Sequence, residues 1–84
     1  MKEYLVKIEV SLKSVVLDPQ GKTVLSALKS LGFENVEDAR IGKLIELKTK
    51  GNSEESVRSD TIEMCEKLLA NPVIEDYSIN ISEI

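Results

Sequence analysis

The chain has 84 residues, of which 42% are hydrophobic, and its 11 basic and 15 acidic side chains give a net charge of −4. These values are typical of one small globular domain spanning residues 1–84, and they exclude a disordered or collagen-like chain. One cysteine and no histidine exclude an intrachain disulfide, the usual zinc sites, a Ser-His-Asp triad and a Cys-His dyad.

Residues 4–12 alternate between apolar and polar side chains, with Leu5 as the only exception. This period of two predicts a half-buried β-strand. After it, Asp18 suits the N-cap of a helix and Pro19 suits the first helical position, because proline presets φ and has no amide hydrogen to satisfy. Gly21 is awkward so early in a helix, so a start near residue 22 is the alternative.

The first helix is expected to run to about Leu31. Val24, Leu28 and Leu31 recur at intervals of four and three residues, which gives the helix one apolar face. Gly32 is expected to follow the helix with positive φ. A helix of roughly 13 residues is not stable alone in water, so we expect it to lie on the sheet.

Residues 36–50 again show the pattern of a strand. The pair Gly42-Lys43 suits a two-residue hairpin turn with glycine in first place, or a bulge in one long bent strand. An unbroken strand of 12 residues would span roughly 40 Å, which is long for so small a domain. We therefore favour a break or sharp bend at Gly42.

A second helix is predicted from about residue 53 to Ala70, with Asn52 or Ser53 as its N-cap. Its apolar residues form a wide face, and Pro72 ends it because proline pushes the preceding residue toward extended geometry. Residues 77–82 alternate and predict the last strand.

This order of elements predicts an α+β fold of the split β-α-β (ferredoxin-like) type, with two helices on one face of an antiparallel sheet. No further layer is available for the other face, where Leu5 and Leu44 are expected to lie. We therefore expect two sheets to meet back to back in a homo-oligomer, although scattered exposed apolar residues are also common on monomers.

The sequence offers little chemistry of its own. An acidic chain repels phosphate backbones, so nucleic-acid binding is disfavoured. Cys65 falls on the apolar face of its helix and is expected in the core, and the isolated glycines form no phosphate-binding loop. No apolar run approaches the roughly 20 residues that span a bilayer, and the N-terminus lacks a signal-peptide pattern, so we expect a cytoplasmic location. We conclude that the isolated chain is not an enzyme, binds no metal or nucleic acid, and works by contacting other proteins.

The residues also resemble a known family. The matching stretches are residues 16–21 (Val-Leu-Asp-Pro-Gln-Gly), 31–33, 36, 40–43 (Arg-Ile-Gly-Lys), 45–47, and 65–77, which contains Leu-Leu-Ala-Asn-Pro-Val-Ile-Glu-Asp-Tyr. In this order they resemble PurS, the small subunit of bacterial and archaeal phosphoribosylformylglycinamidine (FGAM) synthase, over nearly the whole chain.

The resemblance implies a subunit without catalytic residues. PurS-like chains join a synthetase subunit, PurL, which uses ATP and Mg, and a glutaminase subunit, PurQ. The assembly converts formylglycinamide ribonucleotide (FGAR), glutamine and ATP into FGAM in purine biosynthesis, and the small subunit is thought to support ammonia transfer. The resemblance further implies a homodimer or homotetramer.

Two segments are candidates for the interface with these partners. Arg40 and Lys43 flank Gly42, and an arginine there suits a bidentate pair with a partner's carboxylate. The alternative is that both cations are solvated. The second segment is the turn of residues 18–21, in which Asp18, Pro19 and Gly21 are the candidates. Its alternative role is a simple helix cap.

Two rival functions come from other classes. An ACT-like regulatory module that binds small ligands has similar topology, but such modules usually share a chain with an enzyme domain. An acylphosphatase-type enzyme would need an arginine-bearing phosphate loop after the first strand, and residues 13–20 contain no arginine.

Overall fold

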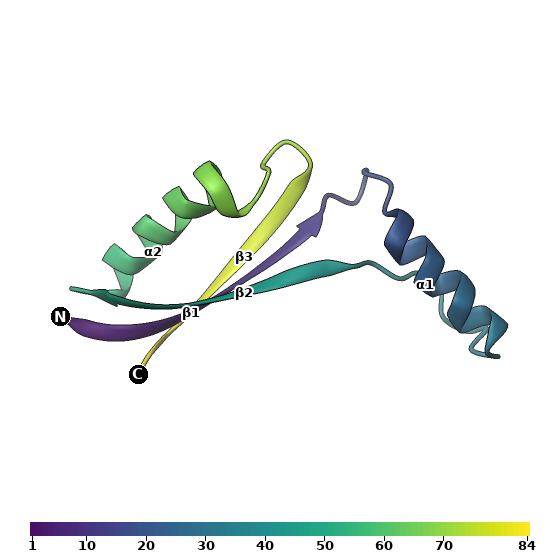
Figure 1. Cartoon of the computed structure of the whole chain (residues 1–84), viewed down its shortest axis with the longest axis horizontal. Helices are drawn as coiled ribbons and strands as arrows, with labels where there is room; N and C mark the ends of the chain where they lie inside the picture. The colour runs from purple at the N-terminus through teal and green to yellow at the C-terminus, as the bar shows by residue number, and fades with distance from the viewer.

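A computed structural model describes residues 1–84 and shows three strands, two α-helices and one π-helical turn (Figure 1). In chain order these are β1 (Lys2–Leu12), α1 (Pro19–Ser30), β2 (Gly42–Gly51), α2 (Glu54–Met64), η1 (Cys65–Leu69) and β3 (Glu75–Glu83). The strands form one antiparallel sheet in the order β2-β1-β3. No helix is long and apolar enough to cross a membrane.

The period-two pattern of β1 places one set of its side chains on the face that α2 covers. Val6 lies opposite Leu47 of β2 and Ile81 of β3, so apolar side chains of all three strands meet on this face. The β1 members are fully or almost fully buried: Tyr4, Val6, Ile8 and Val10. The opposite face is mainly polar, with Leu5 half-buried and Leu44 exposed over 55% of its surface, as the sequence predicts.

The helix α2 and the turn η1 close the core over the sheet. Ser53 is the N-cap, since its side chain accepts a hydrogen bond from the Ser56 amide at 3.1 Å. Val57, Thr61 and Cys65 face the sheet and are buried, and the Thr61 hydroxyl donates to the Val57 carbonyl at 2.7 Å. The sheet, α2 and η1 together form the body of the molecule.

The helix α1 departs from the expected arrangement. Asp18 and Pro19 begin it and Gly32 follows it with φ of 101°, as predicted, but the helix projects from the end of the sheet instead of lying on it (Figure 1). The Cα radius of gyration is 16.4 Å, whereas a compact chain of this length would have about 12 Å. The α+β class is confirmed, and the placement of both helices on one face of the chain's own sheet is corrected: only α2 lies there.

The region around Gly42 also needs a correction. Residues 36–41 form a connection without regular secondary structure outside the sheet. Gly42 is the first residue of β2 and lies opposite Ser11 of β1. The sheet therefore has three strands, with neither a hairpin at Gly42 nor one long strand through it. The break that the sequence predicts at Gly42, within residues 36–50, is the position at which β2 begins.

Candidate functional site

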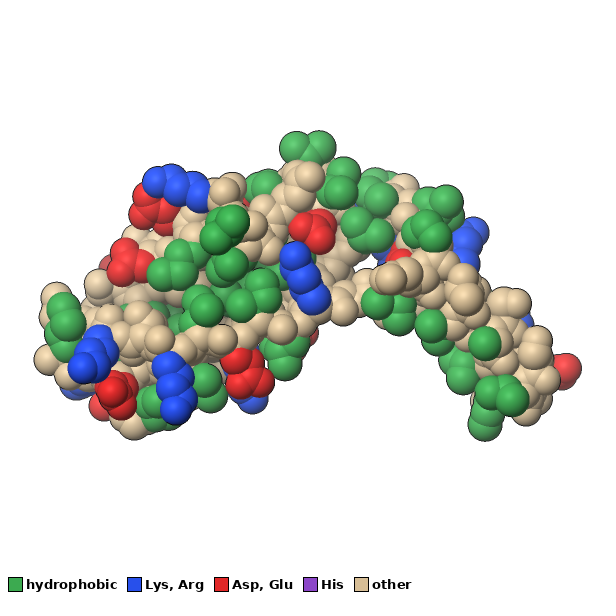
Figure 2. All heavy atoms as spheres, viewed as in Figure 1, with side chains coloured by type: hydrophobic (Ala, Val, Ile, Leu, Met, Phe, Trp, Pro, Cys, Tyr) green, Lys and Arg blue, Asp and Glu red, His purple; other side chains and the backbone are tan.

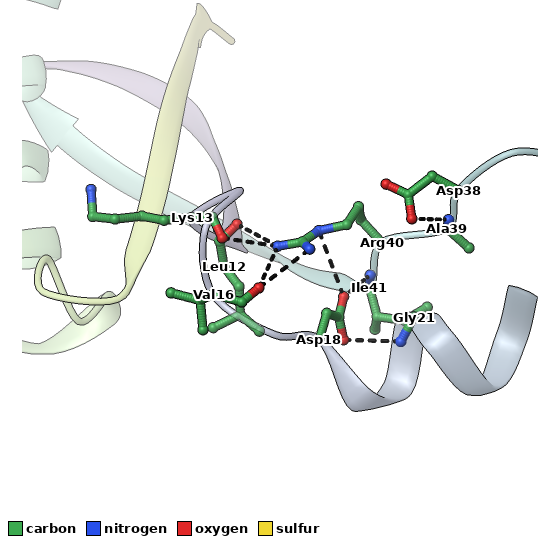
Figure 3. Close-up of polar contacts among 9 residues, drawn as sticks. All are labelled: Leu12, Lys13, Val16, Asp18, Gly21, Asp38, Ala39, Arg40 and Ile41. Carbon is green, nitrogen blue, oxygen red and sulfur yellow. Dashed lines mark hydrogen bonds and ion pairs between the residues drawn. The ribbon is translucent and has the colours of Figure 1, made fainter.

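Two connections join α1 to the sheet, and the predicted interface residues gather where they meet. The first connection is residues 13–18, between β1 and α1, and the second is residues 31–41, between α1 and β2. Figure 3 shows that Asp18 of the first connection and Arg40 of the second point toward each other. In Figure 2 the outline of the molecule bends between the body and the projecting part.

Asp18 holds three groups with one carboxylate. Its Oδ1 accepts a hydrogen bond from the Gly21 amide at 2.9 Å and so caps α1, while Oδ2 accepts one from the Ile41 amide at 2.8 Å. The side chain is only 5% exposed, and the Arg40 Nε lies 4.0 Å from Oδ2. The hydrogen bonds from Ile41 and Gly21, with the charge of Arg40, hold the pKa of Asp18 below its usual value, although burial acts in the opposite direction.

The Arg40 guanidinium binds backbone carbonyls of the first connection and of the end of β1. Its Nη2 donates to the carbonyl of Lys13 at 3.0 Å, of Leu12 at 3.2 Å and of Val16 at 3.4 Å, and Nη1 also reaches Val16 at 3.4 Å. These contacts use the same fork of donors that a partner's carboxylate would need. The bidentate contact with a partner stays a prediction, and it competes with the contacts inside the chain.

Gly21 and Pro19 shape the start of α1. Gly21 is buried, and a Cβ atom there would collide with the Ala39 carbonyl oxygen and lie 2.8 Å from Oδ2 of Asp18. The second connection therefore passes so close to α1 that only glycine fits. Pro19 occupies the first turn of the helix and is exposed.

Gly42 and Lys43 begin β2 beside this junction. A Cβ atom on Gly42 would lie 2.6 Å from the Val10 carbonyl oxygen, so Gly42 allows the strand to approach β1 closely. Lys43 is exposed and makes no ion pair within the chain. With Asp18, it helps to line a cleft of about 280 Å³. Among the six predicted interface residues, Lys43 and Pro19 thus have exposed side chains with no side-chain partner inside the chain.

Other polar and reactive groups lie in the body. Cys65 is buried, and burial together with the Glu66 carboxylate raises the pKa of its thiol, which agrees with the core position predicted for it. The Tyr77 hydroxyl donates to Glu66 at 2.8 Å, and this bond raises the pKa of Tyr77 while joining η1 to β3. No group of three or more His, Cys, Asp or Glu side chains could hold a metal ion.

Sequence reasoning found Asp18 as a helix cap but missed its bond to Ile41 and the whole set of Arg40 contacts. The acceptors of Arg40 are backbone carbonyls, which leave no trace in residue types. The only signal in the sequence was the opposite charge of Asp18, just before α1, and Arg40, near the end of the connection that leads from α1 to β2.

Comparison with known proteins identifies the family. A sequence profile of PurS, described as phosphoribosylformylglycinamidine (FGAM) synthase, matches residues 5–83. The PurS subunit of that synthase from Bacillus subtilis is 52% identical over 81 residues, which cover 96% of this chain and 95% of the relative. The chain belongs to the PurS family. It is therefore a subunit of FGAM synthase, a ligase of purine biosynthesis.

Solved PurS structures share this shape. The crystal structure of PurS from Methanocaldococcus jannaschii superposes with a TM-score of 0.87 at 43% identity, over 96% of this chain and 98% of that one. A chain in the structure of PurLQS from Thermotoga maritima gives a TM-score of 0.88 at 32% identity, over 100% of both chains. The projecting α1 is thus compatible with a PurS fold that includes all 84 residues.

Proposed function

We propose that this chain is the non-catalytic structural subunit of FGAM synthase, joining a PurL-type synthetase to a PurQ-type glutaminase. In this proposal the assembly supports ammonia transfer while FGAR, glutamine and ATP are converted into FGAM. ATP and Mg are used by the synthetase, so this chain needs no cofactor of its own, and the assembly works in the cytoplasm. The observation that carries the proposal is the full-length match to a chain of the PurLQS structure.

The surface of the chain supports a role in contacting other proteins. Val24 of α1 is exposed over 38% of its surface and Leu31, the C-cap residue of the helix, over 74%, although both lie on the face that the sequence pattern marks as apolar. Water contact with such a face is unfavourable by about 25 cal/mol for each Å² of apolar surface. A second copy of the chain or a larger partner would remove that surface from water, so we propose a homodimer or homotetramer within the complex.

The six predicted interface residues fall into two groups under this proposal. Lys43 and Pro19 have exposed side chains and are proposed to touch a partner directly. The remaining four, Asp18, Gly21, Arg40 and Gly42, shape the junction from which α1 projects. Their effect on assembly is therefore exerted through the position of the helix.

Reconstitution tests the proposal. The chain is mixed with PurL-type and PurQ-type proteins, the complex is isolated by size-exclusion chromatography, and glutamine-dependent FGAM formation is measured with and without the chain. We expect a complex containing all three proteins, loss of glutamine-dependent activity when the chain is omitted, and no activity from the chain alone. Full activity of the two larger proteins without it, or turnover by the isolated chain, would contradict the proposal.

A further inference from the structure

The position of α1 raises a physical question, because the helix does not pack on the sheet (Figure 1). A helix is normally held in place by burying an apolar face, and Gly21 is the only buried residue of α1. The direction of the helix must therefore be fixed by the two connections at its ends. Two unrestrained connections of six and eleven residues would leave the helix free to swing.

The contacts between the connections cross over. Arg40 lies in the second connection but binds the Lys13 and Val16 carbonyls of the first. Asp18 lies in the first connection but binds the Ile41 amide of the second, one residue before β2 begins. Each residue thus links its own connection to the other one by hydrogen bonds. The ion pair between Arg40 and Asp18, at 4.0 Å, joins the two sets of bonds (Figure 3).

The same contacts link α1 to the sheet from both sides. Asp18 also caps α1 through the Gly21 amide, and Arg40 also binds the carbonyl of Leu12, the last residue of β1. Hydrogen bonds that involve a charged group are about twice as strong as neutral ones. The first turn of α1, the end of β1 and the start of β2 are therefore joined through two side chains.

We propose that Asp18 and Arg40 form a clamp, consisting of these hydrogen bonds and the ion pair, that sets the angle between α1 and the sheet. They are positioning residues: without the clamp, the body keeps its structure but α1 no longer holds a fixed orientation relative to it. The folding of the body does not depend on the clamp, because none of the buried apolar residues lies in α1 or its two connections. They belong to the sheet, α2 and η1, together with Ala70 directly after η1.

A distance measurement tests the clamp directly. Spin labels are attached to Ser30→Cys at the end of α1 and to Ser82→Cys on β3, in a Cys65→Ala background so that no native thiol competes. Labelled protein is mixed with excess unlabelled protein, so that only distances within one chain contribute. We expect a narrow distance distribution for the parent and a broad one for Asp18→Asn and for Arg40→Gln, with unchanged circular dichroism.

Matched variants separate the clamp from a general effect of charge. Asp38→Asn removes an exposed carboxylate of the second connection. The one hydrogen bond of this carboxylate is accepted from the amide of its neighbour Ala39, so the distribution should stay narrow. Arg40→Lys keeps the charge without the fork and should give an intermediate width. Gly21→Ala changes no charge, but its Cβ atom would collide with the Ala39 carbonyl and crowd the Asp18 carboxylate. It should therefore displace these two groups from α1 and broaden the distribution.

Amide hydrogen exchange provides the second readout. The Gly21 and Ile41 amides donate to Asp18. In Arg40→Gln their exchange should be faster by about tenfold, because the clamp that protects them loses the charge-assisted hydrogen bonds of Arg40. Amides of β1 should keep their parental rates. A distribution that stays narrow in both Arg40→Gln and Gly21→Ala would overturn the clamp and assign the angle of α1 to another contact. If Asp18→Asn fails to fold, these two variants decide the matter.

Discussion

The body and α1 are held in place by different forces. In the body, all seven buried hydrophobic residues form one cluster. The helix α2 buries Val57 and η1 buries Cys65 against the sheet, which positions both elements. At α1 the apolar face is only partly buried: Leu28 is half-buried, whereas Val24 and Leu31 are exposed. The helix is joined to the sheet by hydrogen bonds and one ion pair at its N-terminal end. Figure 2 shows apolar side chains on the visible surface of this projecting part.

An apolar helix face therefore predicts burial but does not identify the surface that buries it. The pattern of Val24, Leu28 and Leu31 is as regular as that of α2, yet only α2 finds its partner surface inside the chain. In a protein that works as a subunit, the partner surface can lie on another chain. In the proposed clamp, the polar junction then holds α1 away from the sheet before the partner chain binds.

The largest expected effect comes from breaking the body. Ile8 is fully buried in the centre of the sheet, so Ile8→Ala removes apolar contacts and leaves a cavity. We expect the free energy of unfolding to fall by about 2–5 kcal/mol, measured by urea denaturation. Val15→Ala, at a residue that is 90% exposed, is the control and should change it by less than about 0.5 kcal/mol. Equal losses would show that the core does not hold the body together.

Local features of the fold follow closely from particular residues. The alternation of residues 4–12 gives β1, Asp18 and Pro19 begin α1, and Gly32 adopts the predicted positive φ. Ser53 was one of two predicted caps and is the one used. Each of these features depends on neighbours within a few residues, which is the range over which residue types carry information.

Long-range features of the candidate site did not follow from the sequence. The direction of α1 depends on which surface covers it, and the start of β2 depends on how close Gly42 lies to Val10. The contacts of Arg40 join residues 24 to 28 positions apart and end on backbone carbonyls. Since every residue carries a carbonyl, no residue type marks these acceptors in advance.

A charge placed on the apolar face of α1 tests whether self-association buries that face. Leu31, at the end of the helix, is 74% exposed, so Leu31→Glu should not unfold the chain. If the apolar face of α1 is covered in the homo-oligomer, the dissociation constant should rise by at least about tenfold, because a buried charge would lack a partner. Sedimentation equilibrium measures this, and Ser30→Glu is the adjacent control. An unchanged constant would remove α1 from the self-association surface.

The third prediction concerns acid. The pKa of Asp18 is lowered in the folded chain, so its carboxylate contributes stability that is fully present above the ordinary aspartate pKa of about 3.9 and is lost as the pH falls through the folded value. The stability difference between the parent and Asp18→Asn should therefore be constant near neutral pH and shrink under acid conditions. Urea denaturation at a series of pH values measures it. A difference that begins to shrink near pH 6 would contradict the lowered pKa.

The smallest expected effect separates two neighbouring cations. Lys43→Ala removes an exposed charge without an intrachain ion pair, so stability should change by less than about 0.5 kcal/mol and the distance from α1 to the sheet should not change. If Lys43 touches a partner directly, affinity for the complex should fall by up to about fivefold, the range of an exposed ion pair. Lys67→Ala, at an exposed lysine of η1 that pairs only with Glu63 of α2, is the control in the same binding assay. For Arg40→Ala, weaker assembly should always be accompanied by a broadened distance distribution, because the Arg40 guanidinium binds carbonyls within its own chain. Weaker assembly with an unchanged distance distribution would instead place Arg40 in the interface with a partner.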